Sequence, residues 1–297
     1  MSLPRIALTA GDPAGIGPEI VRKAIADGRV QQACVPIVYG PDDLSCYAPG
    51  RVSADAGRAA YDAIVRAVDD AKAGRVEAIA TAPVNKVTFA RAGLPWKGHT
   101  DLLAHLCGDC DVAMLFWSDV LRVVLATVHV PLADVPRTLT REVLERTIRL
   151  TARELPAFGI ARPRLAVAGL NPHAGEGGVI GDEEARVLSP AIDAMRRSGI
   201  DVAGPFPGDT VFVRAMRGDF DCVVACYHDQ GLIPIKMAAF GRAVNVTLGL
   251  PIVRTSVDHG TAFDIAGRGV ADPSSMIEAV LLAARLAGGR RAKGAGG

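Results

Sequence analysis

Hydrophobic residues along this 297-residue chain fall into two patterns: short unbroken apolar runs, and longer stretches in which apolar residues recur every three or four positions. The first pattern is typical of strands buried in a parallel sheet, and the second marks the buried face of a helix. The runs predict strands at residues 5–9, 35–39, 78–81 and 164–168, and the helical spacing predicts helices at 18–26, 54–73, 141–155, 183–198 and 276–286. This alternation predicts a doubly wound α/β fold.

Three histidines each follow an apolar run: His129 follows residues 121–128, His173 follows 164–172, and His228 follows 221–227. Ligands of α/β sheets bind at the carboxyl ends of the strands, so we expect the three imidazoles to converge on one crevice and to hold a divalent metal. A single histidine near a strand end is more often structural, and these gaps are too long for a local metal motif. Glycine and polar neighbours beside His173 and His228 favour the metal site.

A glycine-rich loop, residues 11–19 (GDPAGIGPE), joins the first predicted strand to the first helix. Two interpretations carry equal weight, an anion site at the helix N-terminus and a tight turn between strand and helix. The glycine spacing matches neither the GxGxxG fingerprint nor the phosphate loop with its lysine. Further segments that combine glycine or proline with polar groups lie at 81–86, 98–101, 208–210 and 257–267, and together they predict an extended polar active site.

The composition restricts the classes of partner that the protein is expected to bind. The 33 basic residues balance 32 acidic ones, and no basic stripe with interleaved aromatics occurs, which argues against nucleic acid and for small molecules. No apolar run reaches the roughly 20 residues of a membrane span, and the start lacks the pattern of a secretion signal, so we expect a cytoplasmic protein. Residues 288–297 offer nothing to bury and are expected to form a mobile tail.

Nine segments carry a resemblance to a known family, in the family's order and over nearly the whole chain. They are GDPAGIGPEI, TAPVNK, GHTDLLA, ATVHVPL, GLNPHAGEGG, GPFPGDT, YHDQGLIPIK, GRAVN and RTSVDHGTAFDIAGRG. The chain resembles the 4-hydroxythreonine-4-phosphate dehydrogenases of pyridoxal phosphate (vitamin B6) biosynthesis. The resemblance implies two α/β/α domains of the isocitrate and isopropylmalate dehydrogenase type, with the active site in the interdomain cleft. Residues 1–95 with 241–297 would form the dinucleotide side, and residues 96–240 would carry metal, substrate and dimer contacts.

The resemblance also implies roles for individual residues. His129, His173 and His228 would ligate the metal; His99, Thr100, Lys236, Asn245 and Arg254 would bind substrate; Gly11, Asp12, Gly15, His259, Gly260, Thr261 and Asp264 would bind the dinucleotide. Lys236 and Asp229 are the catalytic candidates, and the general base is either Lys236 or a metal-bound water. Zinc is the metal we expect first, with cobalt and magnesium as alternatives, one ion per active site. The cofactor would be NAD, with NADP left open, and the family forms homodimers with shared active sites.

The implied reaction is oxidation of 4-phosphohydroxy-L-threonine by hydride transfer to NAD, giving a β-keto acid that decarboxylates to 3-amino-2-oxopropyl phosphate. Relatives within the family act on D-threonate or D-erythronate 4-phosphate, and the sequence leaves that alternative open. The phosphate acyltransferases of the same fold type, or a non-catalytic sensor, are alternatives that the intact histidines and cations disfavour. One departure is visible: the segment between Gly40 and Ala59 looks shorter than in the family, which leaves the local packing open.

Overall fold

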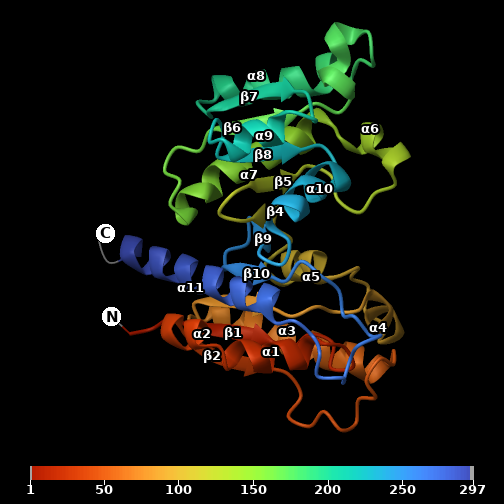
Figure 1. Cartoon of the computed structure of the whole chain (residues 1–297), viewed down its shortest axis with the longest axis vertical. Coiled ribbons are helices and arrows are strands. Elements are labelled where there is room, and N and C mark those ends of the chain that lie inside the picture. The colour runs from red at the N-terminus through yellow and green to blue at the C-terminus, as the bar shows by residue number, and fades with distance from the viewer. Residues whose placement is uncertain (1, 295–297) are drawn as a thin grey trace. The chain divides into compact units, whose positions relative to one another are not determined.

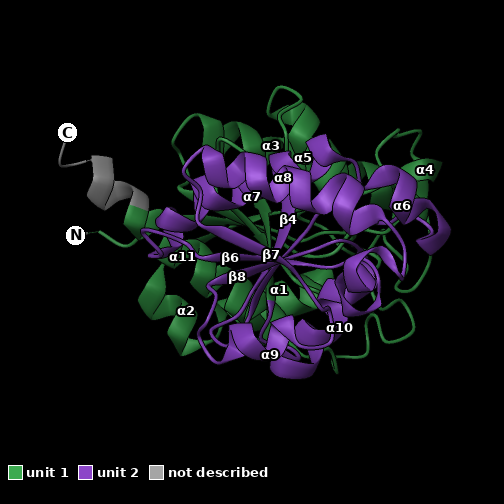
Figure 2. Ribbon diagram, turned by 90° about the horizontal axis from the view of Figure 1, so that it is seen from above, with its two compact units in different colours: residues 1–112, 244–297 green, residues 113–243 purple. Residues whose placement is uncertain are grey.

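The computed structural model describes residues 2–294 and divides into two compact units. Unit 1 consists of residues 1–112 with 244–297, and unit 2 of residues 113–243 (Figures 1 and 2). The sequence instead predicts crossings after residues 95 and 240. The first crossing lies later because helix α5 (His99–Leu106) buries Leu102 and Leu103 completely in the core of unit 1, together with Phe89. His99 and Thr100 therefore belong to unit 1.

Unit 1 is a sheet covered by helices on both faces. Its strands are ordered β2 (Val35–Tyr39), β1 (Arg5–Thr9), β3 (Ala78–Thr81), β10 (Arg254–Ser256) and β9 (Val244–Leu248), and only β9 runs antiparallel to its neighbour β10. Helices α1 (Gly17–Ile25), α2 (Gly28–Ala33) and α11 (Ser274–Gly294) pack together on one face, and α3 (Ala54–Lys72), α4 (Lys86–Arg91) and α5 on the other.

Unit 2 repeats this architecture. Its strands are ordered β4 (Ala113–Trp117), β5 (Arg122–Leu125), β8 (Cys222–Ala225), β6 (Leu165–Ala168) and β7 (Val202–Phe206), with β4 antiparallel to β5 and the others parallel. Helices α7 (Arg141–Glu154) and α8 (Ser189–Arg197) lie on one side of the strands, and α9 (Val211–Met216) and α10 (His228–Ala239) on the other (Figure 2). The short helix α6 (Val135–Thr138) follows a 3-10 turn at Leu132–Asp134.

Local sequence explains where the helices begin. Ser53, Asn85 and Thr140 precede α3, α4 and α7, and each side-chain oxygen accepts a hydrogen bond from the first turn of its helix. Loop 41–50, in the segment that looked short, leads into α3. The loop is mostly exposed, and at its end the N–H of Gly50 donates to the carbonyl of Ala14 at 2.8 Å.

The predicted elements match the structure closely, with two exceptions. The predicted helix 183–198 divides into a π-helical turn (Glu184–Leu188) and α8. Helix α11 continues to Gly294, where a mobile tail was expected from residue 288; residues 295–297 lie outside the described part of the chain. Between residues 2 and 294, no helix combines the length and hydrophobicity that a membrane crossing requires.

Candidate active site

Two of the three histidines predicted as metal ligands lie side by side. Strands β5, β8 and β6 are parallel neighbours, so the segments carrying His129, His228 and His173 leave the same edge of the unit 2 sheet, as the sequence predicts. The rings of His129 and His228 have their centroids 5.5 Å apart. Two imidazoles on one tetrahedral zinc, with Zn–N bonds of about 2.0–2.1 Å, have ring centres roughly 5 Å apart. The pair therefore fits two ligand positions of such an ion.

His173 does not join this pair within one chain. Among residues 2–294, no group of three or more His, Cys, Asp or Glu side chains is placed to hold a metal ion. Within the described part of one chain the three imidazoles therefore do not form a ligand group, and the three-histidine metal site stays a prediction. The physical reason is that the loop after β6 turns back sharply and presents the exposed His173 elsewhere on unit 2.

The turn that carries His173 has an unusual backbone. Residues 173–177 all have positive φ, between 46° and 80°, although only Gly175 and Gly177 are glycines. A left-handed conformation costs a non-glycine residue of the order of 1 kcal/mol, so the surrounding structure must enforce it. Asn171 is the anchor: its backbone N–H and side-chain amide donate to Glu184 at 2.7 and 2.9 Å, and the amide also donates to Glu183 at 2.7 Å.

The buried carboxylate of Glu184 holds the turn in place. Its residue is only 6% exposed, and a Cβ added to Gly175 would lie 2.7 Å from Glu184 Oε2. Gly175 therefore lets the backbone approach a buried carboxylate that in turn holds Asn171. Contacts of Asn171 and Glu184 thus hold the strained turn in its conformation, as is common where a loop presents a functional side chain.

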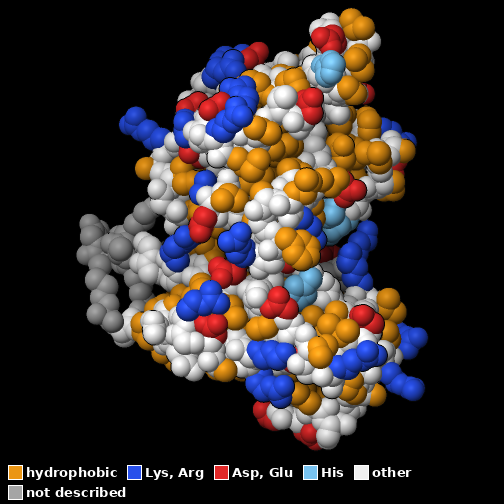
Figure 3. Space-filling model, in the orientation of Figure 1, with side chains coloured by type: hydrophobic (Ala, Val, Ile, Leu, Met, Phe, Trp, Pro, Cys, Tyr) orange, Lys and Arg blue, Asp and Glu red, His pale blue; other side chains and the backbone are white. Residues whose placement is uncertain are grey.

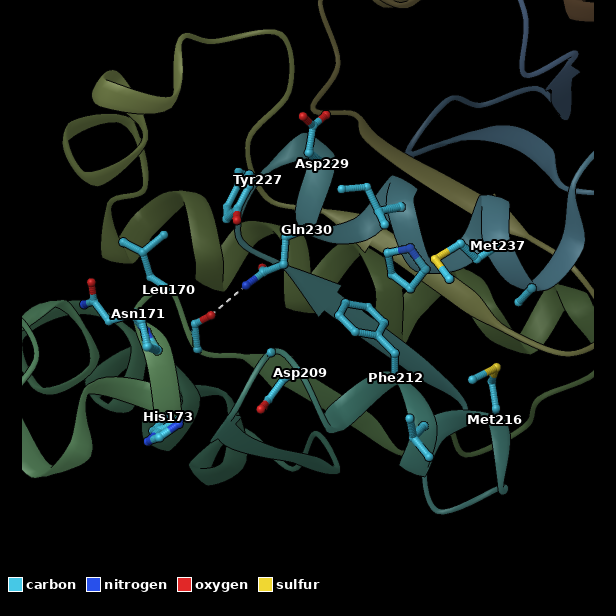
Figure 4. Close-up of a pocket in the computed structure, with 17 residues that line it drawn as sticks. Leu170, Asn171, His173, Asp209, Phe212, Met216, Tyr227, Asp229, Gln230 and Met237 are labelled. Atoms are coloured by element: carbon cyan, nitrogen blue, oxygen red, sulfur yellow. Dashed lines mark hydrogen bonds between the residues drawn. The ribbon is translucent and has the colours of Figure 1, made fainter.

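Two cavities border these histidines. The smaller, of about 210 Å³, is lined by Thr127, His129, Val130, Leu132, Val135, Tyr227, His228 and Asp229. The larger, of about 780 Å³, is bordered by His173, Asp209 and Gln230 with an apolar wall that includes Phe212 and Met237 (Figure 4). Gln230 donates to the carbonyl of Gly169 at 2.7 Å and so ties the start of α10 to the end of β6. Tyr227 and Asp229 line both cavities.

Arg254 is a deeply buried cation of unit 1, at 2% exposure. It donates to the hydroxyls of Thr247 at 2.9 Å and Thr81 at 2.7 Å. Among the described residues no carboxylate pairs with it, and burial lowers the pKa of the guanidinium to about 9. Burial also lowers the pKa of the His99 imidazole well below its usual value, and the charge of Arg254 adds to this effect. His99 is therefore neutral beside an uncompensated cation.

Three of the predicted substrate residues carry a buried polar atom without a hydrogen-bond partner within residues 2–294. His99 Nε2, Asn245 Oδ1 and Arg254 Nε are each buried and make no hydrogen bond among the described residues. Such atoms cost free energy unless a ligand or water satisfies them. Thr100 is half-buried in the first turn of α5, and the half-buried Lys236 lies two turns along α10 from His228, in unit 2.

The glycine-rich loop of residues 11–17 forms a tight turn. The N–H groups of Asp12, Gly15 and Ile16 donate to the carbonyls of Pro83, Asp12 and Thr261, and the N–H of Ala14 donates to the Asp12 carboxylate. These donors are not free for a phosphate, so of the two interpretations the tight turn is the one that the hydrogen bonds match. A Cβ on Gly11 would lie 2.3 Å from Pro83 O, at a φ of +67°, which explains the glycine.

Asp12 lies beneath this loop rather than on its surface. It is fully buried, accepts from the Thr88 hydroxyl at 2.8 Å, and its pKa is raised by burial. The predicted dinucleotide segment packs over the loop: Gly15 would bring a Cβ within 3.0 Å of Thr261, and Asn85 donates to the Thr261 hydroxyl at 3.5 Å. His259 is half-buried, while Gly260 and Asp264 are exposed.

Sequence reasoning missed several residues that shape these sites. Glu176 lies 2.6 Å from His173 Nδ1, Glu184 holds the turn, and Thr247 binds Arg254. The sequence marks Glu176 only as one of the polar neighbours of His173, and its position three residues after that histidine is the signal for a role of its own. Thr247 and Glu184 are brought in by the tertiary structure alone.

Comparison with known proteins identifies the family of the chain. The sequence profile of the pyridoxal phosphate biosynthetic protein PdxA matches residues 18–283. A 4-hydroxythreonine-4-phosphate dehydrogenase of Beijerinckia indica is 46% identical over 95% of this chain and 94% of its own length. A D-threonate 4-phosphate dehydrogenase of Pectobacterium atrosepticum is 43% identical over 95% of this chain and 99% of its own.

Solved structures give the same result. The crystal structure of a 4-hydroxythreonine-4-phosphate dehydrogenase from Klebsiella pneumoniae has a TM-score of 0.87 and 42% identity, covering 96% of this chain and 98% of that one. The isocitrate dehydrogenase of Methylococcus capsulatus, at 20% identity and a TM-score of 0.50 over 93% of this chain and 83% of its own, shares the fold alone. This α/β protein with an isocitrate dehydrogenase-like fold therefore belongs to the PdxA family of pyridoxal phosphate biosynthetic proteins.

Proposed function

We propose that the protein oxidises 4-phosphohydroxy-L-threonine with NAD, and that the resulting β-keto acid loses carbon dioxide to give 3-amino-2-oxopropyl phosphate. The observation that carries the proposal is the buried, unpaired Arg254 beside the unsatisfied atoms of His99 and Asn245. A buried cation without a carboxylate calls for an anionic ligand, and the substrate offers a phosphate and a carboxylate.

The substrate-binding residues differ in what they can do. Arg254 keeps a positive charge and two N–H groups fixed by threonine hydroxyls, so it suits an oxygen anion. His99 is neutral, because its pKa is lowered, and serves as a hydrogen-bond partner without adding a charge. Asn245 and Thr100 would contribute polar groups, and Lys236 is a second candidate cation.

A divalent metal would be held by His129 and His228, with His173 as the third ligand. When bound, the metal supplies a Lewis acid next to the hydroxyl that is oxidised. Imidazole ligands favour zinc, with cobalt and magnesium as alternatives. Since a single chain brings only two of the three imidazoles together, we propose that a second copy completes the ligand set in a homodimer.

An apolar face of unit 2 supports the dimer. Helices α9 and α10 expose Val213, Met216, Ile233, Met237 and Phe240, and hydrophobic side chains gather over this region in the space-filling view (Figure 3). Met237 and Phe240 are 83% and 80% exposed, which is unusual for large apolar side chains. Because α10 begins at His228, a partner that covers this face would lie next to the metal-binding pair.

Segment 258–267 is the proposed binding site of NAD, or NADP, which would supply the hydride acceptor. The segment rests on the tight turn of residues 11–17, so Gly11, Asp12 and Gly15 would support the site and His259, Gly260, Thr261 and Asp264 would face the cofactor. Lys236 remains our candidate for the general base. Asp229 Oδ1 lies 2.7 Å from His228 Nδ1, which favours a positioning role for this carboxylate. The cytoplasmic location stays a prediction of the sequence.

The alternative substrate is D-threonate or D-erythronate 4-phosphate, since one close relative is named for D-threonate 4-phosphate. The test is NADH formation with purified protein, added zinc or cobalt, and each phosphorylated substrate in turn. Turnover of 4-phosphohydroxy-L-threonine that stops on chelation and returns with metal supports the main proposal. Turnover confined to the sugar acid phosphates moves the protein to the alternative, and no turnover with any of them contradicts both.

A further inference from the structure

In two of the three predicted metal ligands, a carboxylate lies within hydrogen-bond distance of the imidazole Nδ1 atom. His173 Nδ1 lies 2.6 Å from Glu176 Oε2, and His228 Nδ1 lies 2.7 Å from Asp229 Oδ1. Glu176 lies in the turn after β6 and Asp229 in the first turn of α10, and they stand at different sequence offsets from their histidines. Their side chains are 56% and 73% exposed, so neither is required to fill the core.

The chemistry of the contact restricts the imidazole. An ionised carboxylate can only accept a hydrogen bond, so the ring nitrogen that it touches must carry the proton. In a neutral imidazole the lone pair then lies on the other nitrogen, Nε2, and this is the nitrogen available to a metal. A carboxylate on Nδ1 thus selects the tautomer and limits rotation of the ring.

We propose that Glu176 and Asp229 are positioning residues that hold His173 and His228 with the proton on Nδ1 and present Nε2 as the metal-ligating atom. This inference rests on the proposed metal centre and adds to it the residues that orient the ligands. Such outer carboxylates commonly contribute 10-fold to 100-fold to metal affinity.

The backbone around Glu176 supports the inference. The left-handed turn brings residue 176 back to the imidazole three positions earlier, and it does so although His173, Ala174 and Glu176 are not glycines. Asn171 and Glu184, which do not belong to the His173–Glu176 pair, hold the turn in this conformation. Figure 4 shows His173 and Asn171 at one end of the larger cavity and Asp229 on the separate helix α10.

Metal affinity of the full-length protein tests the proposal. Zinc and cobalt dissociation constants, measured by competition with a chelating dye, should rise about 10-fold to 100-fold in Glu176→Ala and in Asp229→Ala. Glu176→Gln should recover most of the affinity, because its amide oxygen still accepts from Nδ1–H. Asp182→Asn is the matched control. Asp182 lies six residues after Glu176, its side chain is 72% exposed, and among the described residues it pairs only with Arg186. The metal affinity of this variant should therefore equal that of the wild type.

A second readout does not depend on metal or activity. The chain has six histidines, so ¹⁵N spectra of the metal-free protein can be assigned with single variants. His173 should show the Nδ1–H tautomer in the wild type and a mixture of tautomers in Glu176→Ala. Wild-type affinity and tautomer in Glu176→Ala would overturn the inference and leave the metal centre standing. A wild-type protein that binds neither zinc nor cobalt would overturn the metal centre and the inference with it.

Discussion

Arg254 on β10 donates from Nη2 to the hydroxyl of Thr81 at the end of β3, at 2.7 Å. The two strands are parallel neighbours, and both residues are buried. The two hydroxyls accept hydrogen bonds from the guanidinium but carry no negative charge, so its positive charge is not neutralised. Within the described part of the chain, unit 1 therefore contains a buried positive charge without a counter-ion, and an anionic ligand would neutralise it.

The first prediction concerns Arg254→Met. Replacing a buried, unpaired cation by an apolar side chain should leave the free energy of unfolding of the ligand-free protein unchanged or raise it by about 1 kcal/mol. The same change should abolish the stabilisation that phosphate or the phosphorylated substrate gives to the wild type. Urea unfolding with and without phosphate measures both effects. The exposed Arg22 provides the control Arg22→Met, which should keep the phosphate response. A destabilised Arg254→Met that still responds to phosphate would contradict the proposed anion site.

The second prediction concerns pH and His99. The unfolded imidazole takes up a proton near pH 6.5, whereas the folded one does so only at lower pH, because burial and Arg254 lower its pKa. Below pH 6.5 the unfolded state therefore binds more protons, and the free energy of unfolding falls as the pH falls, by at most about 1.4 kcal/mol per pH unit from this group. His99→Gln should show a smaller loss between about pH 6.5 and pH 5. Equal slopes for the two proteins in urea unfolding would show that His99 titrates normally.

The third prediction compares two glycines of the left-handed turn. Gly175→Ala places a Cβ 2.7 Å from Glu184 Oε2 at a φ of +80°, whereas Gly177→Ala has a φ of +66° and no neighbour within 4 Å of the new atom. Gly177→Ala should cost only the conformational term, about 1 kcal/mol, and Gly175→Ala should cost more because Glu184 must move. Denaturant unfolding gives the difference. Equal losses would mean that Glu184 does not constrain the turn.

The fourth prediction addresses the apolar face of α9 and α10. Met237→Glu introduces a charge at a side chain that is 83% exposed in one chain, so the folded monomer should tolerate it. If a second copy covers this face, the variant should sediment as a monomer and bind zinc more weakly than the wild type, since the ligand set is then incomplete. Val87→Glu, on the exposed face of α4 in unit 1, serves as the control and should leave the sedimentation unchanged. A dimeric Met237→Glu would place the interface elsewhere.

The sequence predicted the fold well because apolar runs and helical spacing report burial directly. Strands 5–9, 35–39 and 78–81 agree residue for residue with β1, β2 and β3. The loops were harder, since their conformations depend on tertiary partners. The π-helical turn at Glu184–Leu188 begins with the buried glutamate that binds Asn171, and no periodicity predicts such a contact.

The same distinction holds for the site. The strand-end argument correctly placed the segments of His129, His173 and His228 at one edge of parallel strands. It could not show how the chain turns after β6, because that turn depends on backbone angles that the residue types do not reveal. Burial of Arg254 could be anticipated from its apolar surroundings. Its threonine partners could not, since they come from distant parts of the chain.

The left-handed turn also restricts the length of its loop. Surface loops usually accept inserted or deleted residues, because their ends can adjust. In a helical turn of either hand, one residue more or less rotates everything that follows by about 100°. A single insertion between His173 and Glu176 would carry the carboxylate to the far side of the turn, and a deletion would do the same in the other direction. The loop therefore cannot gain or lose a residue without separating the Glu176 carboxylate from the His173 imidazole.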